Sequence, residues 1–196
     1  MKKTVALTGK TGAGKSTVSD YLRKKGAYII DGDIIAREVL KTDENLLGEL
    51  CRKFGEDILN SDKTLNRRAL AEKAFSSAEK TEFLNSVMHP VINNEIQRKT
   101  DEAFEKYDVV IVDAAAIIES GFADKCDLLV TVHAPEDVRK ERIIKRDNMT
   151  EKDALIRIKG QKDDSFYLDK ADFVINNFEP YSLEEQLSQL EKELFN

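Results

Sequence analysis

The sequence predicts an α/β fold, a five-stranded parallel sheet between layers of helices, formed by one domain of 196 residues. Short runs rich in valine and isoleucine alternate with longer stretches of helical periodicity, which is typical of parallel strands joined by helices. These runs are continuously apolar, as expected for strands covered on both faces. The first run leads directly into a glycine-rich turn and then a helix. The five predicted strands are residues 4–8, 27–31, 109–113, 128–132 and 173–175.

Composition restricts the possible partners. The chain is 41% apolar and 35% charged, which indicates a packed core under a charged surface rather than disorder. Its net charge of −6 argues against binding to nucleic acid or to anionic membranes. The two cysteines, Cys51 and Cys126, lack metal-ligand spacing, so we expect reduced thiols and a cytoplasmic location. We expect a monomer or a weak homo-oligomer.

A long helical stretch separates the second predicted strand from the third. Apolar stripes occur within residues 46–54, 65–75 and 83–87, and a long helix is predicted to begin at Pro90, whose ring suits a first helical turn. Residues 41–106 are therefore predicted to form a helical subdomain that covers an acceptor substrate. Extra packing without a ligand is the alternative. The predicted core then comprises residues 1–40, 107–135 and 165–196.

A second helical segment, residues 136–164, is dense in arginine and lysine. A capping-box pattern predicts two helices that meet near Thr150. Arg142 and Arg146 are one helical turn apart and share a face. Such a segment is typical of a lid whose arginines stabilise a transferring phosphoryl group and exclude water. The alternative is a solvated charged face in which the arginines pair with acidic neighbours such as Asp147.

The stretch from Val5 to Thr17 matches the phosphate-loop pattern G-x-x-x-x-G-K-[ST], with a strand before it and a helix after it. Its glycines permit positive φ and bring the backbone close to phosphates, toward which loop N–H groups point. Lys15 supplies charge for the β- and γ-phosphates of ATP, and the Ser16 hydroxyl can ligate Mg²⁺. The alternative is a glycine-rich turn with an incidental lysine. The predicted ATP-binding residues of this stretch are Gly9, Thr11, Gly12, Ala13, Gly14, Lys15, Ser16 and Thr17.

Two acidic residues follow the second predicted strand, which we expect to lie beside the phosphate-loop strand. The carboxylate of Asp31 or Asp33 can accept a hydroxyl proton during phosphoryl transfer or hold Mg²⁺ through water. Capping of the following helix is the alternative for either residue. Arg37, one turn beyond Asp33, is placed to grip the phosphate of an acceptor.

Three further residues are candidates for the site. Asp113 ends the third predicted strand and resembles the acid of a Walker B strand, which contacts Mg²⁺. A strand-end turn aspartate is the alternative. Glu119 is a second acid near that strand end, and His89 lies in the predicted acceptor subdomain, where it contacts substrate or is only structural. The candidate metal ligands are Ser16, Asp33 and Asp113.

Together these residues resemble the dephospho-coenzyme A kinase family over nearly the whole chain. Many kinases share the phosphate loop, but Asp31-Gly32-Asp33-Ile34-Ile35-Ala36-Arg37, close to the family's Asp-Ala-Asp-x-x-Ala-Arg, is more selective, as is the later His89-Pro90 pair. Further matching segments are Leu65-Asn66-Arg67-Arg68-Ala69-Leu70, residues 142–147, Gln161, and Ala171-Asp172 before Val174-Ile175-Asn176-Asn177.

The resemblance implies a P-loop kinase fold, like that of nucleoside-monophosphate kinases, with core, lid and coenzyme-A-binding subdomains. It implies that ATP, with Mg²⁺, phosphorylates the ribose 3′-hydroxyl of dephospho-coenzyme A, the last step of coenzyme A biosynthesis. By matching position, Asp33 is the base on that hydroxyl, and Lys15 and Arg142 stabilise the transferring phosphate, with help from Arg146. The residues implied at the acceptor are Asp33, Arg37, Arg67, His89 and Glu119, and Asn177 is implied near the adenine.

The chain departs from the usual family pattern at several positions. Asp113 stands where the family is apolar, Ala115 replaces a proline, and Phe178 stands where glycine is expected near the adenine. Lys10-Thr11 replaces a pair of glycine and a hydrophobic residue. Two alternative functions therefore stay open: a related P-loop kinase for another nucleoside or nucleotide, and a nucleotide-binding regulatory protein that hydrolyses slowly. Asp33 and the lid arginines favour transfer to an acceptor over a switch.

Overall fold

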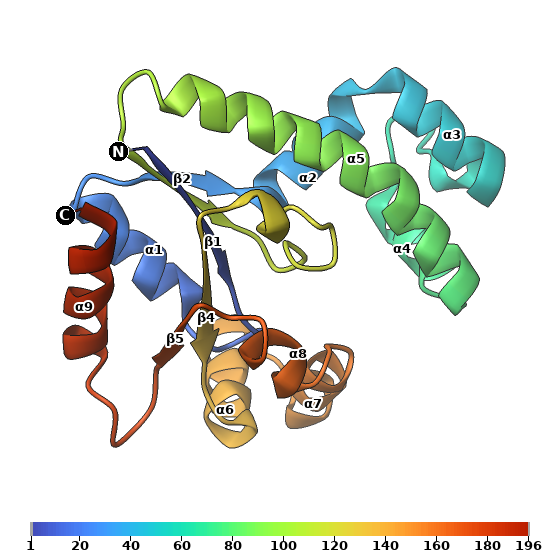
Figure 1. Ribbon diagram of the computed structural model, residues 1–196. Coiled ribbons are helices and arrows are strands. Elements are labelled where there is room, and N and C mark those ends of the chain that lie inside the picture. Colours follow the sequence, from blue (N-terminus) through green and yellow to red (C-terminus); the bar gives the residue numbers. More distant parts are fainter. Residues whose placement is uncertain (1, 196) are drawn as a thin grey trace. The chain divides into compact units, whose positions relative to one another are not determined.

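The computed structural model describes residues 2–195, and within them a five-stranded parallel sheet forms the centre of the fold (Figure 1). The strand order is β2-β3-β1-β4-β5. The predicted α/β class and the five predicted strands are confirmed, each within two residues of its expected bounds. The strands are β1 (Lys3–Thr8), β2 (Tyr28–Asp31), β3 (Val109–Asp113), β4 (Leu128–His133) and β5 (Phe173–Asn176).

The expected position of the second strand is wrong. β2 pairs with β3, and β3 pairs in turn with β1, so β3 separates β2 from the phosphate-loop strand. The burial of the two strands explains this order. Four of the five residues of β3 are buried, as an inner strand requires, whereas only one residue of the short β2 is buried, which suits an edge.

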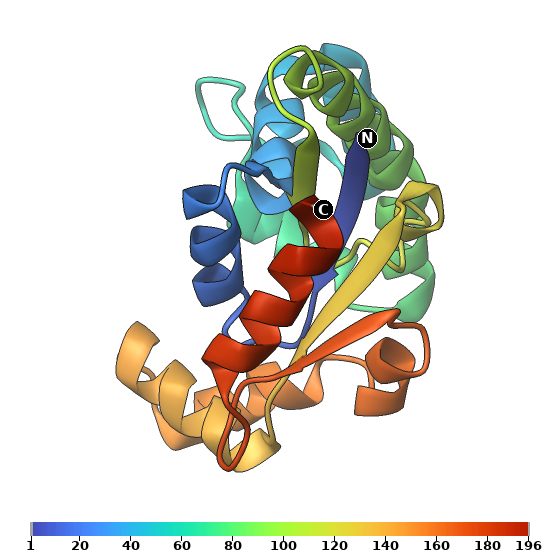
Figure 2. The same cartoon turned by 60° about the vertical axis from the view of Figure 1, so that its left-hand side comes forward.

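The chain divides into two compact units, Met1–Asp31 with Lys99–Asn196, and Gly32–Arg98. The first unit holds the sheet. One face of the sheet is covered by α1 (Lys15–Lys24) and α9 (Leu183–Phe195), which lie side by side in Figures 1 and 2. Both helices contribute leucines to the same core as the strands, because their apolar residues recur at helical spacing. These core residues include Val5, Leu7, Val18, Leu22, Ile111, Val130, Ile175, Leu187, Leu190 and Leu194.

The charged segment after β4 folds as predicted into helices α6 (Glu136–Asp147) and α7 (Glu151–Lys159), followed by the short α8 (Asp164–Leu168). Thr150 caps α7 by accepting a hydrogen bond from the Asp153 N–H at 3.2 Å, which confirms the capping signal. The two longer helices enclose a small core of their own, formed by Ile143, Ala154 and Ile158. A short 3₁₀ turn, η2 (Ala123–Lys125), precedes β4.

The second unit, Gly32–Arg98, is helical. It contains α2 (Gly32–Thr42), α3 (Glu44–Phe54), the 3₁₀ turn η1 (Glu56–Ile58), α4 (Arg67–Ala74) and most of α5 (Ala78–Ala103). An edge-to-face contact between Phe54 and Phe83, with ring centroids 5.8 Å apart, joins α3 to α5. The subdomain boundaries of about 41–106 and 136–164 stay predictions.

The prediction that a helix begins at Pro90 is wrong, because α5 is continuous and contains Pro90 in its interior. A proline lacks the N–H that would donate to the preceding turn, and its ring crowds the carbonyl group there. The apolar residues on both sides of Pro90 nevertheless recur at the spacing of one helix. Met88 and Ile96 are buried from that one helix, so packing outweighs the local preference. Among the described residues, no helix has both the length and the apolar character needed to cross a bilayer.

Candidate active site

The turn between β1 and α1 has the backbone that a phosphate-binding loop requires. Gly9, Gly12 and Gly14 all have positive φ, at 143°, 80° and 104°. A Cβ atom on Gly12 would lie 2.7 Å from the main-chain oxygen of Arg139, and one on Gly14 would lie 2.1 Å from Nδ2 of Asn177. Glycine is therefore needed at these two positions for space as well as for conformation.

The loop opens onto the N-terminus of α1, which begins at Lys15. No acidic side chain stands in the first turn, so that turn presents N–H groups and the positive end of the helix dipole. Ser16 and Thr17 are exposed there, and Nζ of Lys15 donates to the main-chain oxygen of Gly9 at 3.2 Å. The structure thus brings the predicted ATP-binding residues of the loop together as one cradle.

Two residues from later elements close the side of this loop. Arg142 of α6 donates from Nη1 to the main-chain oxygens of Gly12, at 3.4 Å, and Ala13, at 3.3 Å. Asn177, just after β5, donates from Nδ2 to the Ala13 oxygen at 2.8 Å. Arg142 and Asn177, predicted from distant parts of the sequence, therefore meet at the phosphate loop.

Arg146 has a different environment. Its guanidinium forms a bidentate ion pair with Asp147, at 2.7 and 2.8 Å, and Nη1 of Arg157 lies 2.8 Å from the same carboxylate. The hydrogen bond from Arg146 is the main cause of the lowered pKa of Asp147. For Arg146, the geometry matches the alternative of a solvated charged face on the lid helix, because its side chain is 58% exposed.

The acidic residues at the strand ends are arranged as follows. Asp31, the last residue of β2, is the register partner of Asp113 at the end of β3. Asp113 accepts a hydrogen bond from Oγ of Ser19 at 2.6 Å, which ties it to α1. Asp33 is an exposed residue in the first turn of α2, two residues beyond the sheet, and its main-chain oxygen accepts from Nε of Arg37 at 2.9 Å.

The remaining acceptor candidates lie on other elements. Arg67 is the exposed first residue of α4, and His89 is half-buried within α5. Burial lowers the pKa of His89, so the imidazole is neutral at pH 7. Glu119 follows β3, and desolvation raises the pKa of its carboxyl group, while Lys162 opposes that shift. A groove of about 740 Å³ between α2 and α5 is lined by residues other than these candidates, among them Glu38, Asn94 and Arg98.

Sequence reasoning missed three contacts of the phosphate loop. Oε1 of Gln161 accepts from the Thr11 N–H at 2.9 Å, Asp164 pairs with Lys10, and the main chain of Arg139 packs against Gly12. Gln161 carried a signal, since it belongs to the segments that resemble the family. Asp164 carried none, because an acidic residue at a helix start is an ordinary feature of charged surfaces.

Comparisons with known proteins agree with this geometry. The family model described as "Dephospho-CoA kinase" matches residues 3–181. The dephospho-CoA kinase of Corynebacterium efficiens is 42% identical over 177 residues, covering 90% of this chain and 88% of the relative. That of Listeria innocua is 37% identical over 191 residues, covering 97% of this chain and 94% of the relative.

Solved structures show the same fold. The dephospho-CoA kinase of Campylobacter jejuni has a TM-score of 0.72 at 25% identity and covers 98% of this chain and 97% of its own. Shikimate kinase from Bacteroides thetaiotaomicron, at 18% identity and a TM-score of 0.51, shares the fold alone, over 98% of each chain. With its phosphate loop, the approach of Arg142 and this match over residues 3–181, the chain belongs to the dephospho-CoA kinase family.

Proposed function

We propose that this chain uses ATP to phosphorylate the ribose 3′-hydroxyl of dephospho-coenzyme A, with Asp33 as the base on that hydroxyl. The observation that carries the proposal is the family match over residues 3–181, together with the glycine loop that it contains. The chain is a kinase by family, and its relatives' names favour this acceptor over another nucleoside. A slow regulatory hydrolase gains no support from them.

The protein's part in phosphoryl transfer is mainly positioning and charge stabilisation. The main-chain N–H groups of the loop and of the first turn of α1 bind the phosphates of ATP. Lys15 and Arg142 neutralise the charge that develops on the transferring group. Arg146 has a smaller part, because Asp147 accepts hydrogen bonds from its Nε and Nη2 and already balances its charge.

Asp33 accepts the proton as the 3′-hydroxyl attacks phosphorus. Its place in the first turn of α2 keeps the carboxylate exposed, and the main-chain contact with Arg37 keeps that arginine near it on the same helix. Arg37 and Arg67 bind the acceptor's phosphates. His89, being neutral, contributes a hydrogen bond rather than a charge. Glu119 completes the proposed acceptor contacts.

The residues present suit Mg²⁺ bound chiefly through the nucleotide. Among residues 2–195, no three histidine, cysteine, aspartate or glutamate side chains form a cluster that can hold a metal ion by themselves. Kinase Mg²⁺ sites need few protein ligands, because phosphate oxygens and water supply the rest. Ser16 is the proposed direct ligand, with Asp33 and Asp113 acting directly or through water, and the ion neutralises phosphate charge.

We place the enzyme in the cytoplasm, where ATP and reduced thiols coexist, and expect a monomer or a weak homo-oligomer. Both cysteines are free in the structure, which suits a reducing compartment.

The test is ATP turnover by the purified chain with Mg²⁺, measured with and without dephospho-coenzyme A. The proposal expects strong stimulation and a product whose new phosphate is on the ribose 3′ position, identified by mass spectrometry after cleavage with a 3′-nucleotidase. Adenosine and shikimate serve as comparison acceptors. If adenosine alone stimulates turnover, the chain is a kinase for another nucleoside. Equal turnover with every acceptor would exclude a kinase specific for dephospho-coenzyme A.

A further inference from the structure

The outer side of the phosphate loop is held by the short segment Gln161–Asp164, which follows α7. Nζ of Lys10 lies 2.9 Å from Oδ1 of Asp164, and the N–H of Thr11 donates to Oε1 of Gln161 at 2.9 Å. Two consecutive loop residues are therefore fixed by side chains that are more than a hundred residues away in sequence. Both contacts lie within the unit that contains the sheet.

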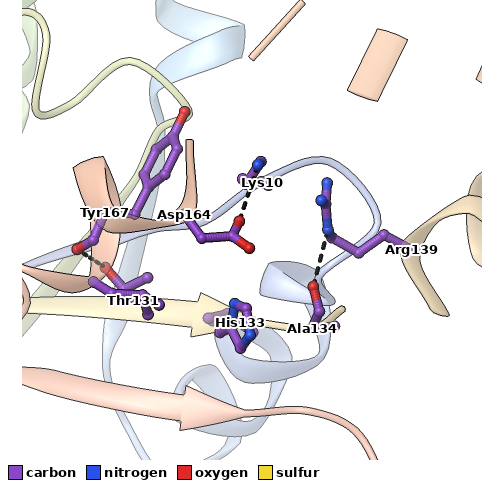
Figure 3. Close-up of a pocket in the computed structure, with 9 residues that line it drawn as sticks. Lys10, Thr131, His133, Ala134, Arg139, Asp164 and Tyr167 are labelled. Carbon is purple, nitrogen blue, oxygen red and sulfur yellow. Dashed lines mark hydrogen bonds and ion pairs between the residues drawn. The ribbon is translucent and has the colours of Figure 1, made fainter. Parts of the chain in front are cut away.

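The carboxylate of Asp164 faces several polar groups in a small pocket behind the loop (Figure 3). The pocket has a volume of about 10 Å³, room for about one water molecule. Burial raises the pKa of Asp164, but the hydrogen bond and charge of Lys10, with the charge of Arg139, lower it more, so the net shift is downward. Asp164 is therefore held as an anion among these groups.

Arg139 is a second cation in the lining of this pocket. Its side chain is only 1% exposed, and Nε donates to the main-chain oxygen of Ala134 at 2.9 Å. Among the described residues, Nη1 of Arg139 meets no hydrogen-bond acceptor. Arg139 lines the same pocket as Asp164 and its charge helps to lower the pKa of that carboxyl group, but Asp164 forms its ion pair with Lys10.

The position of Lys10 argues against direct binding to ATP. Its side chain is 13% exposed, and its ammonium group points to Asp164 in Figure 3. A phosphate loop binds well when its N–H groups already have the bound geometry, because binding then requires little further ordering. An anchor on the second residue of the loop supplies such order without touching the ligand.

We propose that Lys10 is a positioning residue for the nucleotide: its ion pair with Asp164, supported by the Gln161 contact, fixes the phosphate loop in the shape that binds ATP. The inference rests on the proposed ATP site and goes beyond it, since it assigns a role to residues behind the loop. Gln161 and Asp164 belong to the segment that returns from the lid helices to the sheet. Anchoring of the loop by these two residues therefore makes nucleotide affinity depend on that segment.

The experiment compares Lys10→Met, Asp164→Asn, the double variant and Gln161→Met, which removes the second anchor of the loop. Dissociation constants for a non-hydrolysable ATP analogue with Mg²⁺ are measured by calorimetry, with the melting temperature recorded for each variant. We expect each single variant to bind about tenfold more weakly, in the range of one lost charge-assisted contact. The double variant should bind no more weakly than Lys10→Met or Asp164→Asn alone, and Gln161→Met should also bind the analogue more weakly.

Lys159→Met, an exposed lysine at the end of α7, is the matched control and should bind the analogue normally. Kinetics add a readout that a general loss of structure would not give: the KM for ATP rises while kcat and the KM for the acceptor stay unchanged. Gln161→Met keeps the test informative if Asp164→Asn folds poorly, because it releases the loop without changing a charge.

Two outcomes would overturn the inference. If Lys10→Met weakens binding but Asp164→Asn does not, Lys10 contacts the phosphates itself. If neither variant changes the dissociation constant, the pair has no role in nucleotide binding. Binding is measured without an acceptor, so failure to phosphorylate dephospho-coenzyme A would remove the proposed function and leave this result standing.

Discussion

Nη2 of Arg142 donates to the main-chain oxygen of Asn177 at 2.8 Å, and both side chains also reach the main-chain oxygen of Ala13. Helix α6, the end of β5 and the phosphate loop are thus joined through main-chain acceptors. A planar guanidinium spreads five donors over three nitrogens and can reach acceptors that lie apart, whereas the three donors of an ammonium group all leave one nitrogen. The arginine therefore has a geometric role in addition to its charge.

Arg142→Lys should lower kcat by about 100-fold, the scale seen when one donor to a transition state is lost, and should raise the KM for ATP. Lysine keeps the charge but cannot bridge the loop and Asn177 together. Arg146→Lys is the matched control, because Arg146 pairs with Asp147 at the surface, and it should change kcat by less than about threefold. Steady-state kinetics give kcat and the KM for ATP of both variants. An equal loss of kcat in the two variants would mean that Arg146 has the same role as Arg142.

The loop and the strands were predictable because their signals are local. Glycines that need positive φ, a strand before them and a helix after them all fall within a few residues. The order of the strands was not predictable in this way, because whether β2 or β3 lies beside β1 depends on which run can be buried on both sides. The pairs Lys10–Asp164 and Thr11–Gln161 are a further example, since neither acidic nor amide side chains reveal a distant partner.

Gly12→Ala should abolish detectable ATP binding and lower the melting temperature. Alanine at this position would have to keep the positive φ of 80°, which is unfavourable for a residue with a side chain. Its methyl group would also lie 2.7 Å from the Arg139 main-chain oxygen, which cannot move without shifting α6. Gly26→Ala separates the two effects: its φ is 103°, but no described atom lies within 4 Å of the added carbon. That control should lose only about 1 kcal/mol of stability, the cost of a left-handed residue, and keep ATP binding. Calorimetry and thermal unfolding measure both, and equal ATP affinity in the two variants would argue against a tight loop.

Asp33→Asn should lower kcat by about 100-fold or more while the dissociation constant for ATP stays unchanged, because asparagine cannot accept the hydroxyl proton. Asp31→Asn, two residues earlier at the end of β2, is the comparison variant and should keep most of the activity. Single-turnover rates with saturating dephospho-coenzyme A report the transfer step directly. A normal rate for Asp33→Asn would remove this residue from the role of base, and a large loss for Asp31→Asn alone would transfer the role to Asp31.

The two histidines should make the protein less stable in mild acid. Burial lowers the pKa of His89, and burial, opposed by Asp164, lowers that of His133. Both are therefore neutral when folded, whereas an unfolded histidine gains a proton below about pH 6.5. The unfolded state then binds more protons, so the free energy of unfolding falls as the pH drops below that value.

Urea unfolding of the wild type at pH 7.5 and 5.5, compared with His89→Gln, tests this point. Glutamine cannot titrate, so the variant should lose less stability between the two pH values, and carboxyl groups that titrate in both proteins cancel in the comparison. The neutral imidazole also predicts a KM for dephospho-coenzyme A that is flat between pH 6.5 and 8. If the free energy of unfolding changes equally with pH in wild type and variant, His89 has the same pKa in the folded and unfolded states. If the KM for dephospho-coenzyme A rises steeply above pH 6.5, the acceptor binds the charged imidazolium.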